Sequence, residues 1–230
     1  MFGWTGKVLC VDLTSGRATI LRPDPAVYHA FIGGRGLAGH LLAPHATRSW
    51  DDPDLPLLFM AGPLTATIAP TSGRMTAMSV SPLTGTAFDS SVGGKLGTQL
   101  KRAGWDGLVI TGRAPELSGL TIRNAEAALQ PAGDLAGMSA LAVMDALDAR
   151  RADAGEASLA AVGPAAETGS PLASILVDRH HAVGRGGLGL VMAAKNLKYF
   201  TVSGTGRVAV ADPAGLKAAR EDIFRLTAAS

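Results

Sequence analysis

Four glycine-rich clusters contain the residue types that could bind a large anionic ligand. They lie at residues 33–36, at residues 62–65 together with 73–74, at residues 90–94, and at residues 184–189. Three of them come just before a predicted helix, where unpaired backbone N–H groups and the helix dipole favour phosphate. Glycine lets the main chain approach a ligand closely, and Arg35, Arg74 and Arg185 add planar guanidinium groups for phosphate oxygens. We predict that a polyanionic cofactor contacts several of these loops at once.

The glycine clusters are also compatible with simpler roles. A chain with 29 glycines could use them only as turns. No Gly-x-x-x-x-Gly-Lys-Ser/Thr sequence is present, which excludes a P-loop. Gly184, Gly186 and Gly189 match the dinucleotide-binding spacing, but no second half of such a fold is expected after them. The neighbouring His180 and His181 would point to opposite faces of a strand, which disfavours a shared metal ion.

No residue is predicted to act as a catalytic acid, base or nucleophile. The carboxylates that could do so occur singly at turns or strand ends, where a capping or surface role is expected: Asp12, Asp89, Asp106 and Asp134. Neither a nucleophile–base pair nor a Gly-x-Ser-x-Gly sequence is present. The isolated chain is therefore expected to bind a ligand without being active alone.

The composition indicates a folded chain of 230 residues, with 47% hydrophobic and 17% charged residues. A net charge of +2 with dispersed Arg and Lys argues against nucleic acid as a partner. The lone Cys10 is typical of a small buried hydrophobe. It also excludes an iron–sulfur cluster held by one copy of this chain, because such clusters need about four thiolates. No signal-peptide pattern, disulfide framework or membrane-spanning run is present, which predicts a soluble cytoplasmic protein without membrane contact.

Hydrophobic periodicity and turn residues predict paired strands with helices between them, an α+β class. The expected strands cover residues 7–12, 17–21, 55–61, 74–80, 107–111, 120–123, 158–162, 173–177, 198–202 and 207–210. Helices are expected after Asp24 and at the clusters near residues 34, 93 and 187. Ser139 is expected to cap the clearest amphipathic helix, whose apolar residues are Leu141, Met144 and Leu147.

Residues 1–210 are predicted to form the ligand-binding domain, and residues 211–230 a separate C-terminal helix. Asp212 and Pro213 begin this helix. Its apolar residues are Leu216, Ile223, Phe224 and Leu226. The helix could start a further domain, dock against another subunit or another copy of the chain, or fold back on the same domain.

The clusters occur with other motifs in a fixed order. Gly-Gly-Arg-Gly-Leu at 33–37 is followed by Ala-Gly-Pro-Leu-Thr at 61–65, Ala-Pro-Thr-Ser-Gly-Arg at 69–74 and Ser-Pro-Leu-Thr-Gly at 81–85. Gly-Gly at 93–94, Leu-Lys-Arg-Ala-Gly-Trp-Asp at 100–106, Gly-Pro-Ala at 163–165 and the stretches 184–189 and 191–198 come later. From Met1 to about residue 210, the chain resembles the N-terminal domain of the aldehyde:ferredoxin oxidoreductases, a family of tungsten–pterin enzymes.

The resemblance implies two packed mixed or antiparallel β-sheets with flanking helices. It implies that this domain forms a saddle for two pterin dithiolenes around tungsten, or molybdenum, with Mg²⁺ bridging their phosphates. Such enzymes oxidise an aldehyde to a carboxylic acid and pass electrons through an iron–sulfur cluster to ferredoxin. The positions that the resemblance assigns to the cofactor are Gly34, Arg35, Gly36, Gly62, Thr65, Gly73, Arg74, Ser91, Gly93, Gly94, His181, Ala182, Gly184, Arg185, Gly186 and Gly187.

Three positions bear on the implied magnesium and pterin contacts. Ser91 stands where the family commonly has an asparagine that reaches the magnesium, so that a water would have to bridge the shorter serine. Ala182 keeps the position whose backbone carbonyl serves as a magnesium ligand in relatives. His181 stands where a pterin-contacting arginine is usual, and an imidazole lacks the bidentate fork of a guanidinium.

Three functions are compatible with these observations. The family's cluster-binding cysteines and substrate pocket are not among these residues. The chain could therefore supply the pterin saddle to a second polypeptide that carries the cluster and the pocket. It could also self-associate. It could instead be a non-catalytic carrier or sensor of a metal–pterin or another anionic ligand. It could also be a structural subunit that has lost its ligand.

Overall fold

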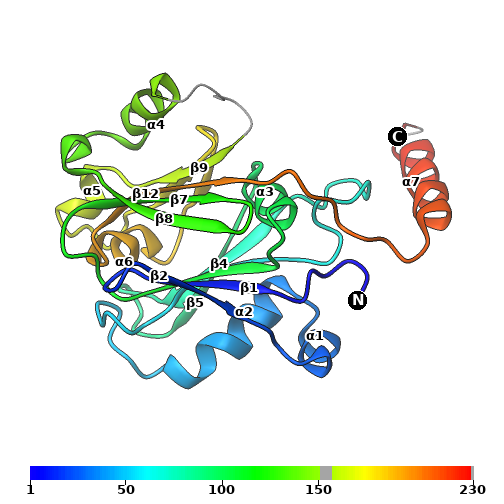
Figure 1. Cartoon of the computed structure of the whole chain (residues 1–230), viewed down its shortest axis with the longest axis horizontal. Coiled ribbons are helices and arrows are strands. Elements are labelled where there is room, and N and C mark those ends of the chain that lie inside the picture. The colour runs from blue at the N-terminus through cyan, green and yellow to red at the C-terminus, as the bar shows by residue number, and fades with distance from the viewer. Residues whose placement is uncertain (151–156, 229–230) are drawn as a thin grey trace.

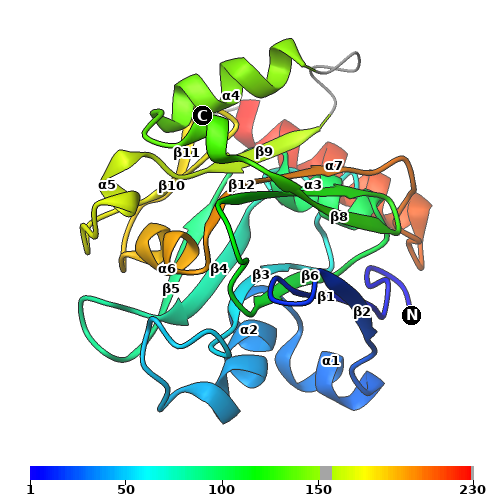
Figure 2. The ribbon, with the colours of Figure 1, turned by 60° about the vertical axis from the view of Figure 1, so that its left-hand side comes forward.

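Two six-stranded β-sheets pack face to face in the computed structural model, which describes residues 1–150 and 157–228 (Figures 1 and 2). Sheet A has the strand order β2-β1-β6-β3-β4-β5, and sheet B has the order β11-β10-β9-β12-β7-β8. Each sheet contains one parallel pair, β1–β6 in sheet A and β7–β12 in sheet B, and its other pairs are antiparallel. The predicted α+β fold with two packed mixed sheets is confirmed.

The elements have short and well-defined bounds. Sheet A contains β1 (Val8–Asp12), β2 (Arg17–Leu21), β3 (Leu57–Ala61), β4 (Met75–Val80), β5 (Ala87–Val92) and β6 (Gly107–Thr111). Sheet B contains β7 (Ser118–Arg123), β8 (Glu126–Pro131), β9 (Ser158–Ala161), β10 (Ile175–Val177), β11 (His181–Val183) and β12 (Leu197–Ser203). The α-helices are α1 (Pro25–Phe31), α2 (Gly34–Leu42), α3 (Leu96–Arg102), α4 (Ala140–Ala149), α5 (Pro164–Glu167), α6 (Leu188–Ala194) and α7 (Pro213–Ala228), and 3₁₀ turns cover Ala43–His45 and Gly133–Leu135.

The main core lies between the two sheets. Every residue of β3 and β4 is buried, as in strands covered on both faces, and all of them are apolar except Thr76 and Ser79. Phe59 of β3 and Phe200 of β12 meet edge to face, with ring centroids 4.9 Å apart. Side chains from α3 and α6 complete this core, among them Leu100 and Val191. The two sheets are therefore joined by a continuous apolar layer.

Helices cover the outer faces of both sheets. The pair α1–α2 packs on sheet A, where Leu37 and Leu42 meet Leu58 and Met60. Helix α4 packs on sheet B, where Val143 and its neighbours meet strands β9 and β12.

The predicted capping residues are confirmed. Asp24 accepts a hydrogen bond from the Ala26 N–H at 2.7 Å, and Pro25 occupies the first helical position of α1. The Ser139 hydroxyl accepts from the Ala142 N–H at 3.2 Å at the start of α4. Leu141 was expected on the buried side of α4 but is 48% exposed, because the buried face consists of Val143, Met144 and Leu147.

The strand predictions were wrong at the sheet edges. Strands β5, β8 and β11 were not predicted, because they are edge or near-edge strands whose polar residues hide the period-2 pattern. The strand expected at residues 207–210 does not form. In this segment the Ala209 carbonyl oxygen instead accepts a hydrogen bond from the Gly3 N–H, at 2.8 Å. The segment therefore contacts the N-terminal residues.

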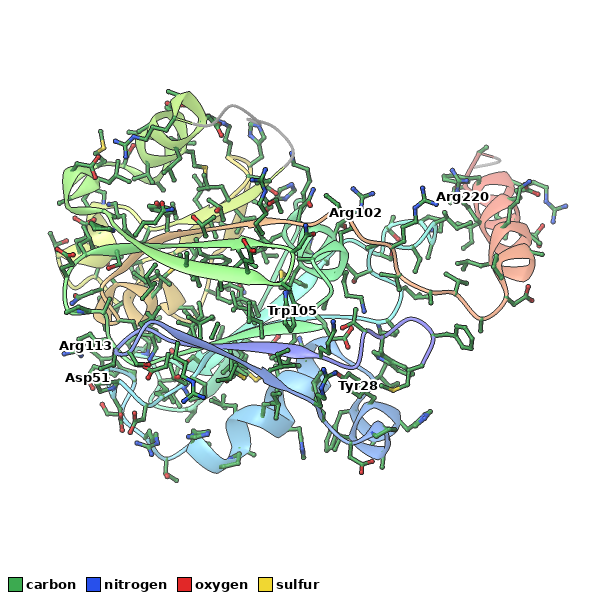
Figure 3. The ribbon with its side chains drawn as sticks, viewed as in Figure 1. Tyr28, Asp51, Arg102, Trp105, Arg113 and Arg220 are labelled. Atoms are coloured by element: carbon green, nitrogen blue, oxygen red, sulfur yellow. The ribbon has the colours of Figure 1, made fainter. Side chains whose placement is uncertain are left out.

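Helix α7 stands away from the two sheets, at the end of the extended segment 204–211 (Figure 1). None of its described residues is buried, and Ile223, Phe224 and Leu226 are exposed. Arg220 lies on this helix (Figure 3), and its guanidinium lies 5.1 Å from the centre of the Phe224 ring of the same helix. The alternative in which this helix folds back on the sheets is therefore wrong for the described residues. No helix within those residues is both long and apolar enough to cross a membrane.

Candidate anion-binding site

The four glycine clusters converge along one strand, β5, at the edge of sheet A. This edge lies against β11, the edge strand of sheet B, so that the two sheets meet there through their polar edges. On β5 the side chains of Asp89 and Ser91 share one face, because they are two residues apart. Partner residues for both come from loops at other points of the chain, and these contacts define the site.

Two arginines cross the exposed face of β5. The Arg35 Nε donates to Asp89 Oδ2 at 2.9 Å. The Arg74 Nε donates to the Ser91 hydroxyl at 2.9 Å, and its Nη2 donates to the Ser91 carbonyl at 3.1 Å. The Arg35 side chain is 74% exposed, and no bond of its two terminal nitrogens is found within the described residues. Both guanidinium groups are thus oriented by β5 and retain donors for a further acceptor.

The loops that carry these arginines touch one another. A Cβ at Gly33 would lie 2.8 Å from the Ala61 carbonyl oxygen and 3.2 Å from the Gly62 Cα, so the first two clusters are in contact. The Gly73 backbone in turn lies beside the Gly94 carbonyl, which joins the second cluster to the third. Thr65 is buried, and its hydroxyl accepts from the Gly62 N–H and donates to the Ser72 carbonyl at 3.0 Å. Thr65 therefore closes the loop at residues 62–73 from within.

The third cluster meets His181 of β11. A Cβ at Gly93 would lie 2.8 Å from His181 Nδ1, which is closer than side chains approach in proteins. The imidazole therefore lies directly on the Gly93 backbone, and a side chain at this position would require the His181 ring to move. His181 and the following Ala182 are both exposed. This contact brings the sheet B half of the predicted site to the end of β5 that carries Ser91.

The fourth cluster meets the other end of β5. Gly186 packs on the Phe88 ring so closely that a side chain there would overlap it, and its φ of +79° is in the left-handed region. Arg185 lies in an adjoining groove of about 240 Å³, whose lining includes Leu83, Phe88 and Leu172. The Arg185 guanidinium makes no hydrogen bond with the described part of the chain. The predicted site residues thus lie along one edge, from Phe88 to Gly94.

A preformed metal site is not found at this edge. The described residues contain no group of three or more His, Cys, Asp or Glu side chains arranged to hold a metal ion. The Ser91 hydroxyl and carbonyl oxygens both accept hydrogen bonds from Arg74. A magnesium ion at Ser91 and Ala182 stays a prediction, which would need ligand phosphates to supply most of its oxygen ligands.

The single carboxylates divide into structural groups and one site residue. Asp106 is buried and accepts from the backbone of Thr5 and Gly6 and from Lys101 Nζ at 2.5 Å. Asp12 caps the β1–β2 hairpin, and Asp134 pairs with an arginine at the surface. Asp89 was expected to be a cap or surface group, but it lies in the site as the partner of Arg35. Its position two residues before Ser91 was the sequence signal for this role.

Comparison with known proteins identifies the architecture. Residues 8–204 match the family model described as the aldehyde ferredoxin oxidoreductase N-terminal domain. The chain belongs to this family. The resemblance of its glycine-rich motifs is thereby confirmed, and the four clusters are those of an aldehyde ferredoxin oxidoreductase N-terminal domain.

Relatives of this domain are much longer than the chain. The tungsten-containing aldehyde ferredoxin oxidoreductase of Pyrococcus furiosus is 35% identical over 214 residues, which are 92% of this chain and 35% of that protein. The protein of the same description from Pyrococcus abyssi is 36% identical over 229 residues, 98% of this chain and 38% of that protein. The chain thus spans a little over a third of these relatives, whose descriptions name tungsten.

A solved structure shows the same fold. It is described as the active site complex BamBC of benzoyl coenzyme A reductase in complex with 1,5-dienoyl-CoA. The TM-score is 0.93 at 32% sequence identity, over 97% of this chain and 34% of the other chain. The match covers nearly all of this chain. The two sheets of this chain therefore have the same arrangement as in a protein whose description names a different enzyme, benzoyl coenzyme A reductase.

Proposed function

We propose that this chain is the cofactor-binding part of a tungsten or molybdenum oxidoreductase of the aldehyde ferredoxin oxidoreductase type. The ligand would be a bis-pterin whose phosphates are bridged by Mg²⁺. The reaction would be the oxidation of an aldehyde to a carboxylic acid, with electrons passed to an iron–sulfur acceptor and then to a ferredoxin-like protein. The lone cysteine favours the reducing cytoplasm as its location.

The convergence of the four glycine clusters on β5 is the observation that carries this proposal. Arg35 and Arg74 are held by their bonds to Asp89 and Ser91, with donors left for phosphate oxygens. Gly93 lets the backbone of sheet A lie directly against His181, which brings the two halves of the site together. These features suit a large ligand with separate negative groups, which is the chemistry of a phosphate-bearing pterin cofactor.

The chain's own residues would bind and orient this ligand. When bound, the metal–pterin group would supply the two-electron chemistry, and the protein would supply placement and electrostatics. Arg35, Arg74 and Arg185 would neutralise phosphate charge from different loops. His181 and Ala182 would close the site from sheet B. No side chain of this chain is assigned a proton-transfer role.

A partner would have to supply the iron–sulfur cluster and the substrate pocket. This chain spans a little over a third of its relatives, and the remaining part of such a protein, on the same polypeptide or another, is the proposed partner. Exposed apolar side chains near the site support a covering partner, since contiguous exposed apolar surface usually marks an interface. They lie in the loops that carry the glycine clusters and their neighbours, at Leu64, Ile68, Leu83 and Leu172, and the separate helix α7 exposes Ile223, Phe224 and Leu226 as well.

A non-catalytic carrier or sensor of the same ligand is the second candidate. It is favoured by Ser91, whose hydroxyl and carbonyl are both used by Arg74, and by His181 in place of the usual arginine. Both changes would weaken the contacts to magnesium and pterin without removing the anion-binding loops. A structural subunit without ligand is the third candidate, and no observation specifically favours it.

Elemental analysis of protein purified from its own host without oxygen would separate these functions. The oxidoreductase and the carrier both predict about one tungsten or molybdenum with two phosphorus atoms per chain, and magnesium in addition. Recovery of an iron-containing partner in the same preparation, with aldehyde-dependent dye reduction, would favour the enzyme. Metal and phosphorus without any such activity would favour the carrier. Protein free of metal and phosphorus would contradict both.

A further inference from the structure

We propose that Asp178 is a positioning residue that fixes the separation between the two halves of the anion-binding site. One half belongs to sheet A, with Arg74, Ser91 and Gly93. The other half belongs to sheet B, with His181 and Ala182. The inference rests on the proposed function for the identity of the ligand, whereas the contacts of Asp178 are independent of it.

The Asp178 carboxylate joins its own turn to two other segments of the chain. Its Oδ2 accepts from the Lys95 N–H at 2.6 Å, between Gly94 and the start of α3. Its Oδ1 accepts from the Leu159 N–H at 3.1 Å in β9. The buried Ser158 hydroxyl lies 2.8 Å from Oδ1 and 2.9 Å from Oδ2. A single side chain thus connects the end of the β5 segment in sheet A to the first residues of β9 in sheet B.

The turn that carries Asp178 is held in an uncommon conformation. Asp178 and Arg179 have φ values of +47° and +66°, which side-chain-bearing residues adopt only where the surroundings enforce it. The Asp178 N–H donates to the Leu159 carbonyl at 3.0 Å, which fixes one side of the turn. Arg179 fixes the other side through two aspartates of α4, Asp145 at 2.7 Å and Asp148 at 2.9 Å. These contacts on both sides of the turn therefore fix the direction in which strand β11 continues from it.

This turn places the imidazole on the glycine backbone of sheet A. A Cβ at Gly94 would lie 2.6 Å from Asp178 Oδ2 and 3.1 Å from His181 Cδ2. The imidazole therefore lies against both Gly93 and Gly94, and the carboxylate lies against Gly94. Donors from Lys95, Ser158 and Leu159 stabilise the carboxylate, which makes it a structural anion and not a competitor for the arginines.

The test uses the full chain with Asp178→Ala, with Ser158→Ala as a milder variant that removes one donor and keeps the turn. Asp12→Ala is the matched control, because that carboxylate also accepts a backbone N–H and a serine hydroxyl but lies in the β1–β2 hairpin. Two quantities are measured in each variant. One is the nuclear Overhauser effect between the His181 ring and the Gly93 Hα protons. The other is the affinity for inorganic diphosphate by calorimetry.

In Asp178→Ala we expect the His181–Gly93 Overhauser effect to disappear and diphosphate binding to weaken about tenfold. Ser158→Ala should weaken both signals less, and Asp12→Ala should change neither. If Asp178→Ala folds and keeps the Overhauser effect, the inference is overturned. If Asp178→Ala does not fold, an unchanged Overhauser effect in Ser158→Ala overturns it instead. Should the unmodified chain not bind diphosphate, the proposed function fails, and the Overhauser effect alone still decides the role of Asp178.

Discussion

Replacing Arg74 with alanine should weaken anion binding far more than it weakens the fold. One edge of the Arg74 guanidinium is used by Ser91, at 2.9 and 3.1 Å, and these two bonds leave the other N–H donors, on Nη1 and Nη2, for a phosphate oxygen. A hydrogen bond to a charged group contributes about 1.5–3 kcal/mol, and screening at an exposed position favours the lower value. We therefore expect a loss of about 1.5 kcal/mol, or roughly tenfold in the dissociation constant. The free energy of unfolding should change by less than about 0.5 kcal/mol, as for other exposed residues.

Calorimetric titration of the chain with inorganic diphosphate measures this loss, and urea unfolding measures the stability. Arg17→Ala is the control, because Arg17 is an equally charged and exposed residue on the edge strand β2. Arg74→Lys, which keeps the charge without the fork, should fall between the two. Equal weakening by Arg17→Ala would mean that net charge alone attracts the anion. Unchanged affinity in Arg74→Ala would remove Arg74 from the site.

Three further predictions concern the fold. Phe200→Ala should lower the free energy of unfolding by about 3–5 kcal/mol in urea, because it empties the contact with Phe59 between the sheets; a loss below about 1 kcal/mol would contradict this packing. Burial lowers the pKa of Lys195 to about 8, whereas this pKa stays near 10.5 in the unfolded chain. Between these two pH values the unfolded state binds more protons than the folded state. The free energy of unfolding should therefore rise with pH in this range, by at most about 3 kcal/mol. This part of the rise should be absent in Lys195→Met, as shown by urea midpoints at pH 7.5 and 9.5. Removal of residues 211–230 should leave the urea midpoint of the chain unchanged, since no described residue of α7 is buried; a clear decrease would show that α7 packs on the sheets.

The interior of the fold could be predicted from the sequence because apolar periodicity reports burial. Strands β3 and β4, at residues that are apolar almost throughout, were expected within one or two positions. The caps at Asp24 and Ser139 were expected because their hydrogen bonds are local. Edge strands such as β5 and β11 could not be predicted in this way, since their residues serve the site instead of the core.

The candidate site was only partly visible in the sequence. Glycines next to Arg35, Arg74 and Arg185 indicated anion binding, and the structure brings their loops to one strand. The partners that orient these groups could not be predicted, because they are distant in the chain. Asp89 lies 54 residues from Arg35, and Asp178 lies 83 residues from Lys95. No local pattern relates residues at such separations.

The central claim is that loops from separated parts of the chain bind one metal-bearing anionic ligand at the edge of β5. Anomalous X-ray scattering at the tungsten and molybdenum edges, from crystals of protein prepared without oxygen from its own host, tests this claim most directly. The account predicts one metal peak per chain, beside the face of β5 that carries Ser91 and close to His181. A peak at another surface, or an unbound site in protein that retains full phosphorus and metal content, would contradict it.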